Sequence, residues 1–278
     1  MNESRTVGSS RVSGSLLSAL GWIVALGMFF PVLWMVLTAF KQERDAFTSP
    51  PKFAFTPTLD QFDAVLTGGL NAALLNSLWV TLGSTALVIL LALPAAYALS
   101  IRPIEKWQDV LFFFLSTRML PVVGAIVPIY VIARDIAMLD NVWTLVVLYT
   151  AINLPIAVWM LRSFMSEVPT EVLEASRVDG ASLWQEATKV LFPMIAPGIA
   201  ATALICVIFA WNEFFLAVTL TAVRAQTVPV YLVGFITSEG AFWARLSAAA
   251  TLAAIPVLLA GWIAQRYLVR GLTLGAIK

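Results

Sequence analysis

Long apolar blocks separated by short polar connectors follow one another along most of this chain. The first block carries no charged side chain from Val12 to Phe40, an interval long enough to cross about 30 Å of hydrocarbon as a helix. It is also longer than the apolar core of a cleavable signal peptide, so we expect it to be retained. Five further blocks follow, at residues 76–100, 110–133, 142–161, 195–220 and 245–265. The pattern predicts an all-α integral membrane protein with six transmembrane helices.

Polar segments flank and interrupt these blocks. Residues 1–15 are rich in Ser and Gly and predict a short tail, and a second tail is expected at residues 271–278. The six helices then form one transmembrane domain at residues 16–270. From Lys41 to Leu75 the composition is mixed and punctuated by prolines, which predicts an ordered extramembrane loop rather than another helix.

One long polar insertion, residues 169–193, lies between the fourth and fifth blocks. Its first helix is expected to begin at Pro169 and to stop at Gly180, which can adopt a positive φ. Ser182 and Gln185 have the spacing of a capping box for a second helix, which should end before the proline at position 193. The insertion is therefore predicted to be a helix-turn-helix.

The second of these helices has one apolar and one polar face. The apolar face comprises Leu183, Trp184, Ala187, Val190 and Leu191, and the polar face comprises Gln185, Glu186, Thr188 and Lys189. The charged side chains of the insertion would be costly to leave unpaired in hydrocarbon. The helix-turn-helix must therefore lie outside the bilayer core, where it can dock a partner.

The composition supports a membrane protein and excludes several classes of function. Hydrophobic residues make up 60% and charged residues 12% of the 278 residues, with a mean hydropathy of +0.89, whereas soluble proteins average about 45–50% and about 25%. A net charge of +1 argues against nucleic acid as a partner. The chain has no His, and its single Cys, Cys206, lies in an apolar run. We expect contact with membrane lipid, no metal site, no catalytic residue and no enzymatic activity.

Lys and Arg are distributed unequally between the two sides that six spans would define. The ten on the side assigned to the cytoplasm are Arg5, Arg11, Arg102, Lys106, Arg162, Arg177, Lys189, Arg266, Arg270 and Lys278. The six on the opposite side are Lys41, Arg44, Lys52, Arg134, Arg224 and Arg245. The positive-inside rule therefore places both termini and the helix-turn-helix in the cytoplasm. Lys41 and Arg44, directly after the first span, oppose this assignment.

The helix-turn-helix also carries a specific motif. Glu174-Ala175-Ser176 is followed after three residues by Gly180, and after nine more by the run Val190-Leu191-Phe192-Pro193. This spacing resembles the EAA loop of the membrane subunits of binding-protein-dependent ABC importers, whose pattern is Glu-Ala-Ala, Gly and Ile-x-Leu-Pro. Ser176, Val190 and Phe192 depart from that pattern only conservatively in size.

Four further stretches extend the resemblance over nearly the whole chain. They are Asn76-Ser77-Leu78, Ala95-Ala96-Tyr97-Ala98, Trp211-Asn212-Glu213-Phe214 and the tail from Arg270 to Lys278. Together they resemble the carbohydrate-importer subgroup, of the kind represented by the smaller membrane subunit of the maltose transporter. The resemblance implies a multi-pass permease subunit of the bacterial cytoplasmic (inner) membrane. Such a subunit forms half of the translocation path for a sugar, sugar alcohol or sugar conjugate.

The same resemblance implies several partners: a second, different permease subunit, two ATP-binding subunits and an extracytoplasmic substrate-binding protein. This chain has no GxxxxGK[ST] loop, so ATP and Mg are expected on the partner subunits and no cofactor on this chain. The family also suggests that the tail after Arg270 reaches the ATPase, and that the loop from Thr221 to Trp243 touches the binding protein.

The resemblance assigns coupling to the ATPase to the loop at residues 166–193. The residues concerned are Glu174, Ala175, Ser176, Asp179, Gly180 and Pro193. Glu174 is a candidate for an ion pair at the docking groove, while Ala175 and Gly180 are small enough for close approach. Asp179 is alternatively a cap of the second helix.

Candidates for the substrate path are polar or aromatic residues within the predicted spans. They are Thr117, Arg118, Asn153, Trp211, Asn212 and Glu213. Amides hydrogen-bond hydroxyl groups and indoles stack on sugar faces, and ionisable residues inside spans tend to face the bundle interior or water. Two purely structural roles remain open, because Arg118 can extend toward the membrane surface and Glu213 can hold the fifth helix by hydrogen bonding.

An ion-coupled secondary transporter of a small polar solute is the alternative function. Such carriers use acidic or His relays and are often built from symmetric halves. This chain has one Glu in its predicted spans, no His, and no counterpart of the helix-turn-helix in its first half. The sequence therefore favours the importer subunit, without identifying its cargo.

Overall fold

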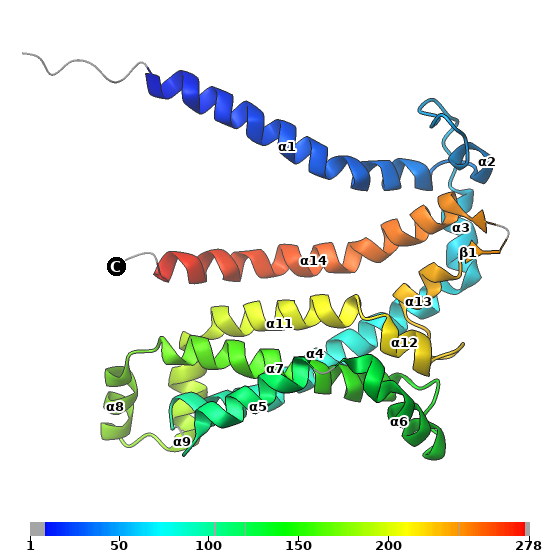
Figure 1. Ribbon diagram of the computed structural model, residues 1–278. Coiled ribbons are helices and arrows are strands. Elements are labelled where there is room, and N and C mark those ends of the chain that lie inside the picture. The colour runs from blue at the N-terminus through cyan, green and yellow to red at the C-terminus, as the bar shows by residue number, and fades with distance from the viewer. Residues whose placement is uncertain (1–8, 103, 120, 239, 276–278) are drawn as a thin grey trace, which may run out of the picture. The chain divides into compact units, whose positions relative to one another are not determined.

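The computed structural model describes residues 9–102, 104–119, 121–238 and 240–275, and within them the side chains of residues 17–265. The described chain is almost entirely helical (Figure 1). It divides into two units. Unit 1 comprises the chain up to Gly68 together with Phe235–Leu252, and unit 2 comprises Gly69–Gly234 and the chain from Ala253 onward.

Unit 1 holds the first long helix and the segment that follows it. Helix α1 (Ser9–Ala39) confirms the first predicted helix, although its backbone becomes helical within the predicted polar tail. Two short helices, α2 (Glu43–Ala46) and α3 (Asp60–Val65), occupy the segment predicted as a loop. Strands β1 (Ile236–Thr237) and β2 (Gly240–Ala241) form a small antiparallel pair. The described chain is mostly helical, as predicted, and adds this one short strand pair. The prediction of a loop without a helix at residues 41–75 is wrong, because α2 and α3 lie there.

Acidic side chains favour the short helices of unit 1. Both short helices carry acidic residues in the first turn, where these complement the helix dipole. Glu43 also accepts hydrogen bonds from the backbone N–H groups of Ala244 and Arg245, at 3.0 and 3.3 Å, in the first turn of α14 (Trp243–Gly275). Glu43 thereby joins two segments of unit 1 that are far apart in sequence.

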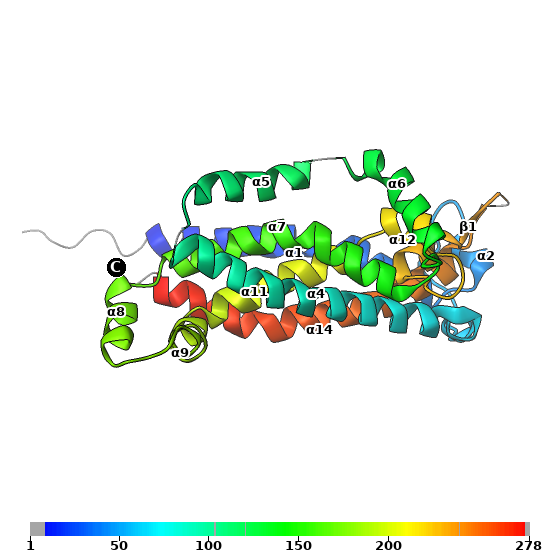
Figure 2. The same ribbon diagram turned by 90° about the horizontal axis from the view of Figure 1, so that it is seen from below.

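Three long helices lie side by side in unit 2 (Figures 1 and 2). They are α4 (Asn71–Ser100), α7 (Val142–Ser166) and α11 (Ala196–Trp211). The approach of α7 and α11 is close at Gly198, where a Cβ atom would lie 2.4 Å from the ring of Phe164. Small residues let membrane helices pack in this way, so the contact requires glycine.

Backbone breaks change the predicted bounds of the second and third spans. Helix α4 begins earlier than residue 76 because α3 continues into it through a π-helical turn, η1 (Leu66–Leu70), with a kink at Gly69 (φ 107°). The third block is divided into α5 (Trp107–Met119) and α6 (Val122–Asp135). Pro121 is the N-cap residue of α6, and a proline there favours a boundary because it restricts the backbone before it.

The later spans differ as well. The fifth block is divided, because α11 ends at Trp211 and a separate helix, α12 (Phe215–Leu220), follows. A further short helix, α13 (Val228–Val233), lies in the segment predicted as a loop. Helix α14 continues past the predicted end of the sixth span as far as Gly275. Residues 276–278 of the predicted C-terminal tail and residues 1–8 of the N-terminal tail lie outside the described residues.

Among the described residues, four helical stretches are long and apolar enough to cross a membrane: Leu17–Ala39, Asp60–Ser100, Val142–Ser166 and Trp243–Gln265. The number reaches six if each of two bent helix pairs counts as one span. One pair is α5 with α6, and the other joins Leu183–Met194 to α11 at an angle of 76°. The described chain is therefore a multi-helix membrane protein with four to six apolar spans.

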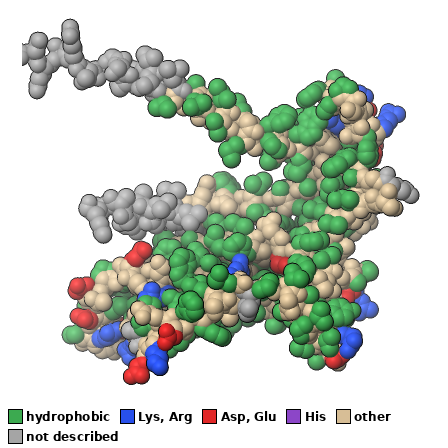
Figure 3. All heavy atoms as spheres, viewed as in Figure 1, with side chains coloured by type: hydrophobic (Ala, Val, Ile, Leu, Met, Phe, Trp, Pro, Cys, Tyr) green, Lys and Arg blue, Asp and Glu red, His purple; other side chains and the backbone are tan. Residues whose placement is uncertain are grey.

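Charged side chains on the visible face of unit 2 gather at its two ends (Figure 3). One group covers the end that carries α8 and α9, and another covers the end that carries α6, with mostly uncharged side chains and a few isolated charged ones between them. This distribution fits a unit whose middle lies in hydrocarbon and whose ends lie in water.

Candidate functional site

The predicted helix-turn-helix is present at one end of unit 2 (Figure 1). Its first helix is α8 (Thr170–Val178), and Gly180 follows with φ at 81°, which confirms the predicted stop. Ser182 and Gln185 form the predicted capping box at the start of α9 (Leu183–Gln185). Local sequence signals therefore define the first helix, the turn and the start of the second helix.

The second helix differs from its prediction after its first turn. A π-helical segment, η2 (Glu186–Leu191), follows α9 and leads into α10 (Phe192–Met194). The prediction that the helix ends before Pro193 is wrong, because Pro193 lies in the first turn of α10, where a missing N–H is tolerated.

The π-helix also changes which side chains face inward. A π-helix has more residues per turn than an α-helix, so the faces expected from an α-helical period are rotated. Glu186, predicted on the polar face, is fully buried, whereas Leu183 and Trp184, predicted on the apolar face, are exposed, Trp184 by 73%. The predicted division into an inner apolar face and an outer polar face is therefore wrong at these three positions.

Glu186 is held by two partners from different elements. Its Oε2 accepts a hydrogen bond from Arg177 Nε at 2.6 Å, and its Oε1 accepts from Arg177 Nη2 at 3.1 Å and from the Tyr97 hydroxyl at 2.5 Å. The hydrogen bond from Arg177 holds the pKa of the Glu186 carboxyl below its usual range. Because Tyr97 lies near the end of α4, this network joins the helix-turn-helix to that long apolar helix.

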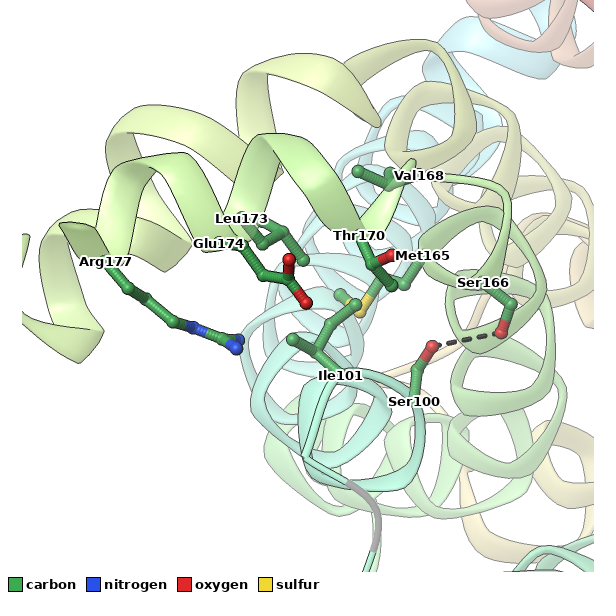
Figure 4. A pocket seen from close by; sticks show the side chains of 9 residues that line it. All are labelled: Ser100, Ile101, Met165, Ser166, Val168, Thr170, Leu173, Glu174 and Arg177. Atoms are coloured by element: carbon green, nitrogen blue, oxygen red, sulfur yellow. Dashed lines mark hydrogen bonds between the residues drawn. The ribbon is translucent and has the colours of Figure 1, made fainter. Parts of the chain in front are cut away.

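A cavity of about 220 Å³ lies beside this network, between α8 and the ends of α4 and α7 (Figure 4). It is lined by Ser100, Ile101, Met165, Ser166, Val168, Thr170, Leu173, Glu174 and Arg177. Glu174 and Arg177 project from α8 toward Ile101, while Ser100 and Ser166 are hydrogen-bonded at 3.0 Å across α4 and α7.

The residues predicted to couple the chain to a partner lie mainly on the surface. Glu174, Ala175, Asp179, Gly180 and Pro193 are exposed. Ser176 is half-buried and donates its hydroxyl to the Leu173 carbonyl at 2.8 Å. Asp179 is the C-cap residue of α8 and does not cap the second helix, where Ser182 is the cap. Val178, which the sequence reasoning did not single out, adds an exposed apolar side chain beside Asp179.

Arg118 and Thr117 lie near the end of α5 and are exposed. Arg118 donates through Nη1 to the Ile152 carbonyl of α7, and its guanidinium lies 4.9 Å from the ring centre of Phe209. The carbonyl that Arg118 binds therefore belongs to α7, in the turn before a proline of that helix, and not to the neighbourhood of Pro121. Thr117 donates its hydroxyl to the Phe114 carbonyl at 2.7 Å, within its own helix.

The other four candidates for the substrate path differ in burial and in their hydrogen bonds. Asn153 is only 1% exposed and Trp211 is also buried, so both lie inside unit 2. Neither side-chain polar atom of Asn153 has a hydrogen-bond partner in the described part of the chain. Asn212 is exposed and donates to the Ile208 carbonyl at 2.8 Å. Glu213 is half-buried, and its carboxylate accepts from backbone N–H groups in the first turn of α12, at 3.0 and 3.3 Å.

Sequence reasoning missed Asp140, in the turn between α6 and α7. Its carboxylate accepts four backbone hydrogen bonds, at 2.9 to 3.2 Å, from Ala222, Val223, Arg224 and Ala225. Burial acts to raise the pKa of Asp140, but the four N–H groups outweigh it and lower the pKa to about 2. The folded pKa lies below the unfolded value of about 3.9, so this stabilisation is present above pH ~4 and is lost as pH falls toward 2.

Most of the chain matches a known protein family. The family described as "Binding-protein-dependent transport system inner membrane component" matches residues 88–274. The match includes the whole helix-turn-helix, both bent helix pairs and the turn that carries Asp140.

Relatives and solved structures agree with that match. A probable ABC transporter permease protein of Sinorhizobium fredii is 39% identical and covers 97% of this chain and 98% of its own length. The diacetylchitobiose uptake system permease protein DasC of Streptomyces coelicolor is 33% identical, over 92% of this chain and 94% of its own. A bacterial ABC transporter involved in alginate import has a chain with the same fold, with a TM-score of 0.75 at 22% identity over 95% of this chain and 99% of that one.

The Glu186 network generates a stability prediction. Arg177→Ala should lower the free energy of unfolding by about 3 kcal/mol, since it leaves a buried carboxylate without its cation. The value lies at the low end of the range for buried pairs because the Arg177 side chain is 39% exposed. Glu186→Gln should cost less, because it removes the buried charge itself. Thermal unfolding of the purified protein measures both.

Glu174→Gln is the matched control for these two variants, because Glu174 is an exposed carboxylate on the same helix as Arg177. It should unfold within about 0.5 kcal/mol of the wild type. Equal unfolding of Arg177→Ala and Glu174→Gln would contradict a stabilising role for the network.

Proposed function

Because the chain belongs to the family of binding-protein-dependent transport system inner membrane components, we propose that it forms half of a translocation path for a sugar, sugar alcohol or sugar conjugate. The observation that carries the proposal is the exposed helix-turn-helix, which has the spacing of the EAA loop and is fastened to α4 through Glu186. A carbohydrate cargo is supported by the name of the diacetylchitobiose relative.

We propose that the chain crosses the bacterial cytoplasmic membrane six times. The pair α5 and α6 then counts as one span, and α11, after its bend from Leu183–Met194, counts as another, in addition to the four unbroken apolar helices. Both termini and the helix-turn-helix lie in the cytoplasm in this proposal. The support is the excess of Lys and Arg on that side, ten against six, and the need for the loop to meet an ATPase.

The helix-turn-helix is the proposed contact with an ATP-binding subunit. Its exposed residues include two acidic ones, Glu174 at the cavity beside α4 and Asp179 at the end of α8, together with the small residues Ala175 and Gly180 and the apolar residues Val178 and Trp184. Interfaces combine an apolar contact area with a few charged groups that fix the register. ATP and Mg bind to two such partner subunits, and this chain transmits the movement without hydrolysing ATP.

The remaining proposed partners are a second, different permease subunit, which supplies the other half of the path, and an extracytoplasmic substrate-binding protein. A path that runs between two subunits is lined by side chains that are exposed on each subunit when it is considered alone. Three candidates are exposed in this way, namely Arg118, Thr117 and Asn212. Two others, Asn153 and Trp211, are buried within unit 2. We therefore assign cargo contact to the exposed three, and a capping role in α12 to Glu213.

The docking assignment is tested by charge and bulk on the loop surface. Glu174→Lys and Gly180→Arg should each reduce transport and copurification of the ATP-binding subunit by about tenfold or more, since either change opposes close docking. Glu105→Lys, in the exposed turn before α5, makes the same charge change at the same end of unit 2 and should have little effect. Normal transport and normal copurification in both loop variants would refute the docking role.

The cargo assignment predicts different defects at two ionisable residues. Arg118→Gln should lower transport about tenfold while ATP hydrolysis stimulated by the binding protein persists, because glutamine can still donate to the Ile152 carbonyl but carries no charge. Glu213→Gln should instead lower the free energy of unfolding by about 1 kcal/mol, as expected for a weakened helix cap. Transport, ATP hydrolysis and thermal unfolding of reconstituted complexes distinguish the two. The reverse pattern would place Glu213 in the path.

The orientation is tested with a reporter enzyme that is active only outside the cytoplasm. Fused after Asp60, the reporter should be active, and fused after Lys106 or Lys189 it should be inactive, because only the first position lies on the side with fewer Lys and Arg. Expression of each fusion is checked by immunoblot. An inverted pattern would overturn the proposed function.

A further inference from the structure

The segment Thr221–Val228, which runs from the end of α12 to the first residue of α13, is bound through its backbone from two sides. Asp140 lies on one side, and its carboxylate accepts hydrogen bonds from four consecutive backbone N–H groups of the segment. The backbone N–H of Asp140 also donates to the carbonyl of Leu220 at 2.9 Å, at the end of α12. Successive N–H groups that converge in this way form an anion-binding concavity, and here the chain's own carboxylate fills it.

Two residues near the start of α4 bind the same segment from the other side. The Asn76 side-chain amide donates to the carbonyl oxygens of Arg224 and Gln226, at 2.8 and 2.9 Å. The hydroxyl of Ser77 accepts from the backbone N–H of Val228 at 2.8 Å. The segment is therefore joined both to α4 and to the turn that precedes α7.

These contacts fix the path of the backbone and leave side chains free. Val223 is 84% exposed, and Ala222 and Arg224 are exposed as well. In unit 2 the segment lies at the end opposite α8 and α9 (Figures 1 and 2). A loop whose backbone is already ordered avoids the loss of conformational freedom that a flexible loop suffers when a partner binds.

We propose that Asp140 and Asn76 are positioning residues that hold segment Thr221–Val228 in the shape engaged by the extracytoplasmic binding protein. The inference rests on the proposed function, which supplies the binding protein. Asp140 acts through the backbone of the segment and touches no cargo. Its carboxylate suits this role because charge-assisted hydrogen bonds to N–H groups are stronger than neutral ones.

Asp140→Asn tests the carboxylate with little change of shape. Asp140 has φ at 52°, a conformation that asparagine tolerates as well as aspartate does, so the backbone turn is kept. In the complete complex, the binding-protein concentration for half-maximal ATP hydrolysis should rise about tenfold, equivalent to about 1.4 kcal/mol. The maximal rate of stimulated ATP hydrolysis should stay within about twofold of the wild-type rate. A poorly positioned segment weakens the binding of the binding protein and leaves the ATP-hydrolysis step unchanged.

Asp135→Asn is the matched control. Asp135 is at the end of α6, exposed, and paired only with its neighbour Arg134 at 2.8 Å among the ion pairs of the described residues. It carries the same charge at the same end of unit 2, and its side-chain hydrogen bonds within the described residues come from Arg134 rather than from the segment. For the Asp135→Asn complex, the binding-protein concentration that gives half-maximal ATP hydrolysis should match that of the wild type.

The outcomes separate this inference from the proposed function. An unchanged half-maximal concentration in Asp140→Asn, or a lower maximal rate with no such change, would overturn the positioning role. If Asp140→Asn does not assemble, Asn76→Ala carries the same expectation from the α4 side, and an unchanged value there overturns the inference. A wild-type complex that the binding protein does not stimulate would overturn the proposed function, and the inference with it.

Discussion

A fully buried carboxylate, Glu186, sets the strongest constraint on this structure. A charge removed from water is tolerated only when paired and hydrogen-bonded, so Glu186 requires both Arg177 from α8 and Tyr97 from α4. Loss of Arg177 would leave the buried charge uncompensated, and loss of Tyr97 would leave Glu186 without its hydrogen bond from α4. The helix-turn-helix is thus exposed on its outer surface but bound to the transmembrane helices on its inner one. A displacement of the loop that preserves these bonds carries the end of α4 with it.

Helix α4 is joined at its other end to a second segment. Tyr97 and Asn76 lie about 30 Å apart along the helix axis, from the α-helical rise per residue, which matches the hydrocarbon thickness of a bilayer. Asn76 and Ser77 bind the segment at Thr221–Val228, as Tyr97 binds Glu186. One helix therefore connects the surface proposed to meet the ATPase with the segment proposed to meet the binding protein. This arrangement suits a transport cycle in which both surfaces change together.

The parts of this arrangement that sequence predicted are those set by neighbouring residues. The helix cap depends on Ser182 and Gln185, three positions apart, and the turn depends on Gly180. Both features could therefore be predicted from the local sequence. The burial of Glu186 could not be predicted, since this residue lies in a π-helix and the expected faces assumed an α-helical period. Asp140 was missed for a related reason, because its four donors lie more than 80 residues away.

Three carboxylates of this chain bind backbone N–H groups rather than side chains. Glu43, Asp140 and Glu213 each accept from N–H groups of a loop or helix start, and such bonds do not depend on the side chains of the segment they hold. The shape of the segment at Thr221–Val228 is therefore independent of the residues it displays. Arg177 and Glu186 are the opposite case, because each needs the other's side chain. The end of unit 2 that carries α8 is thus specified by an ion pair, whereas the opposite end keeps its shape while its exposed side chains can vary with the partner they meet.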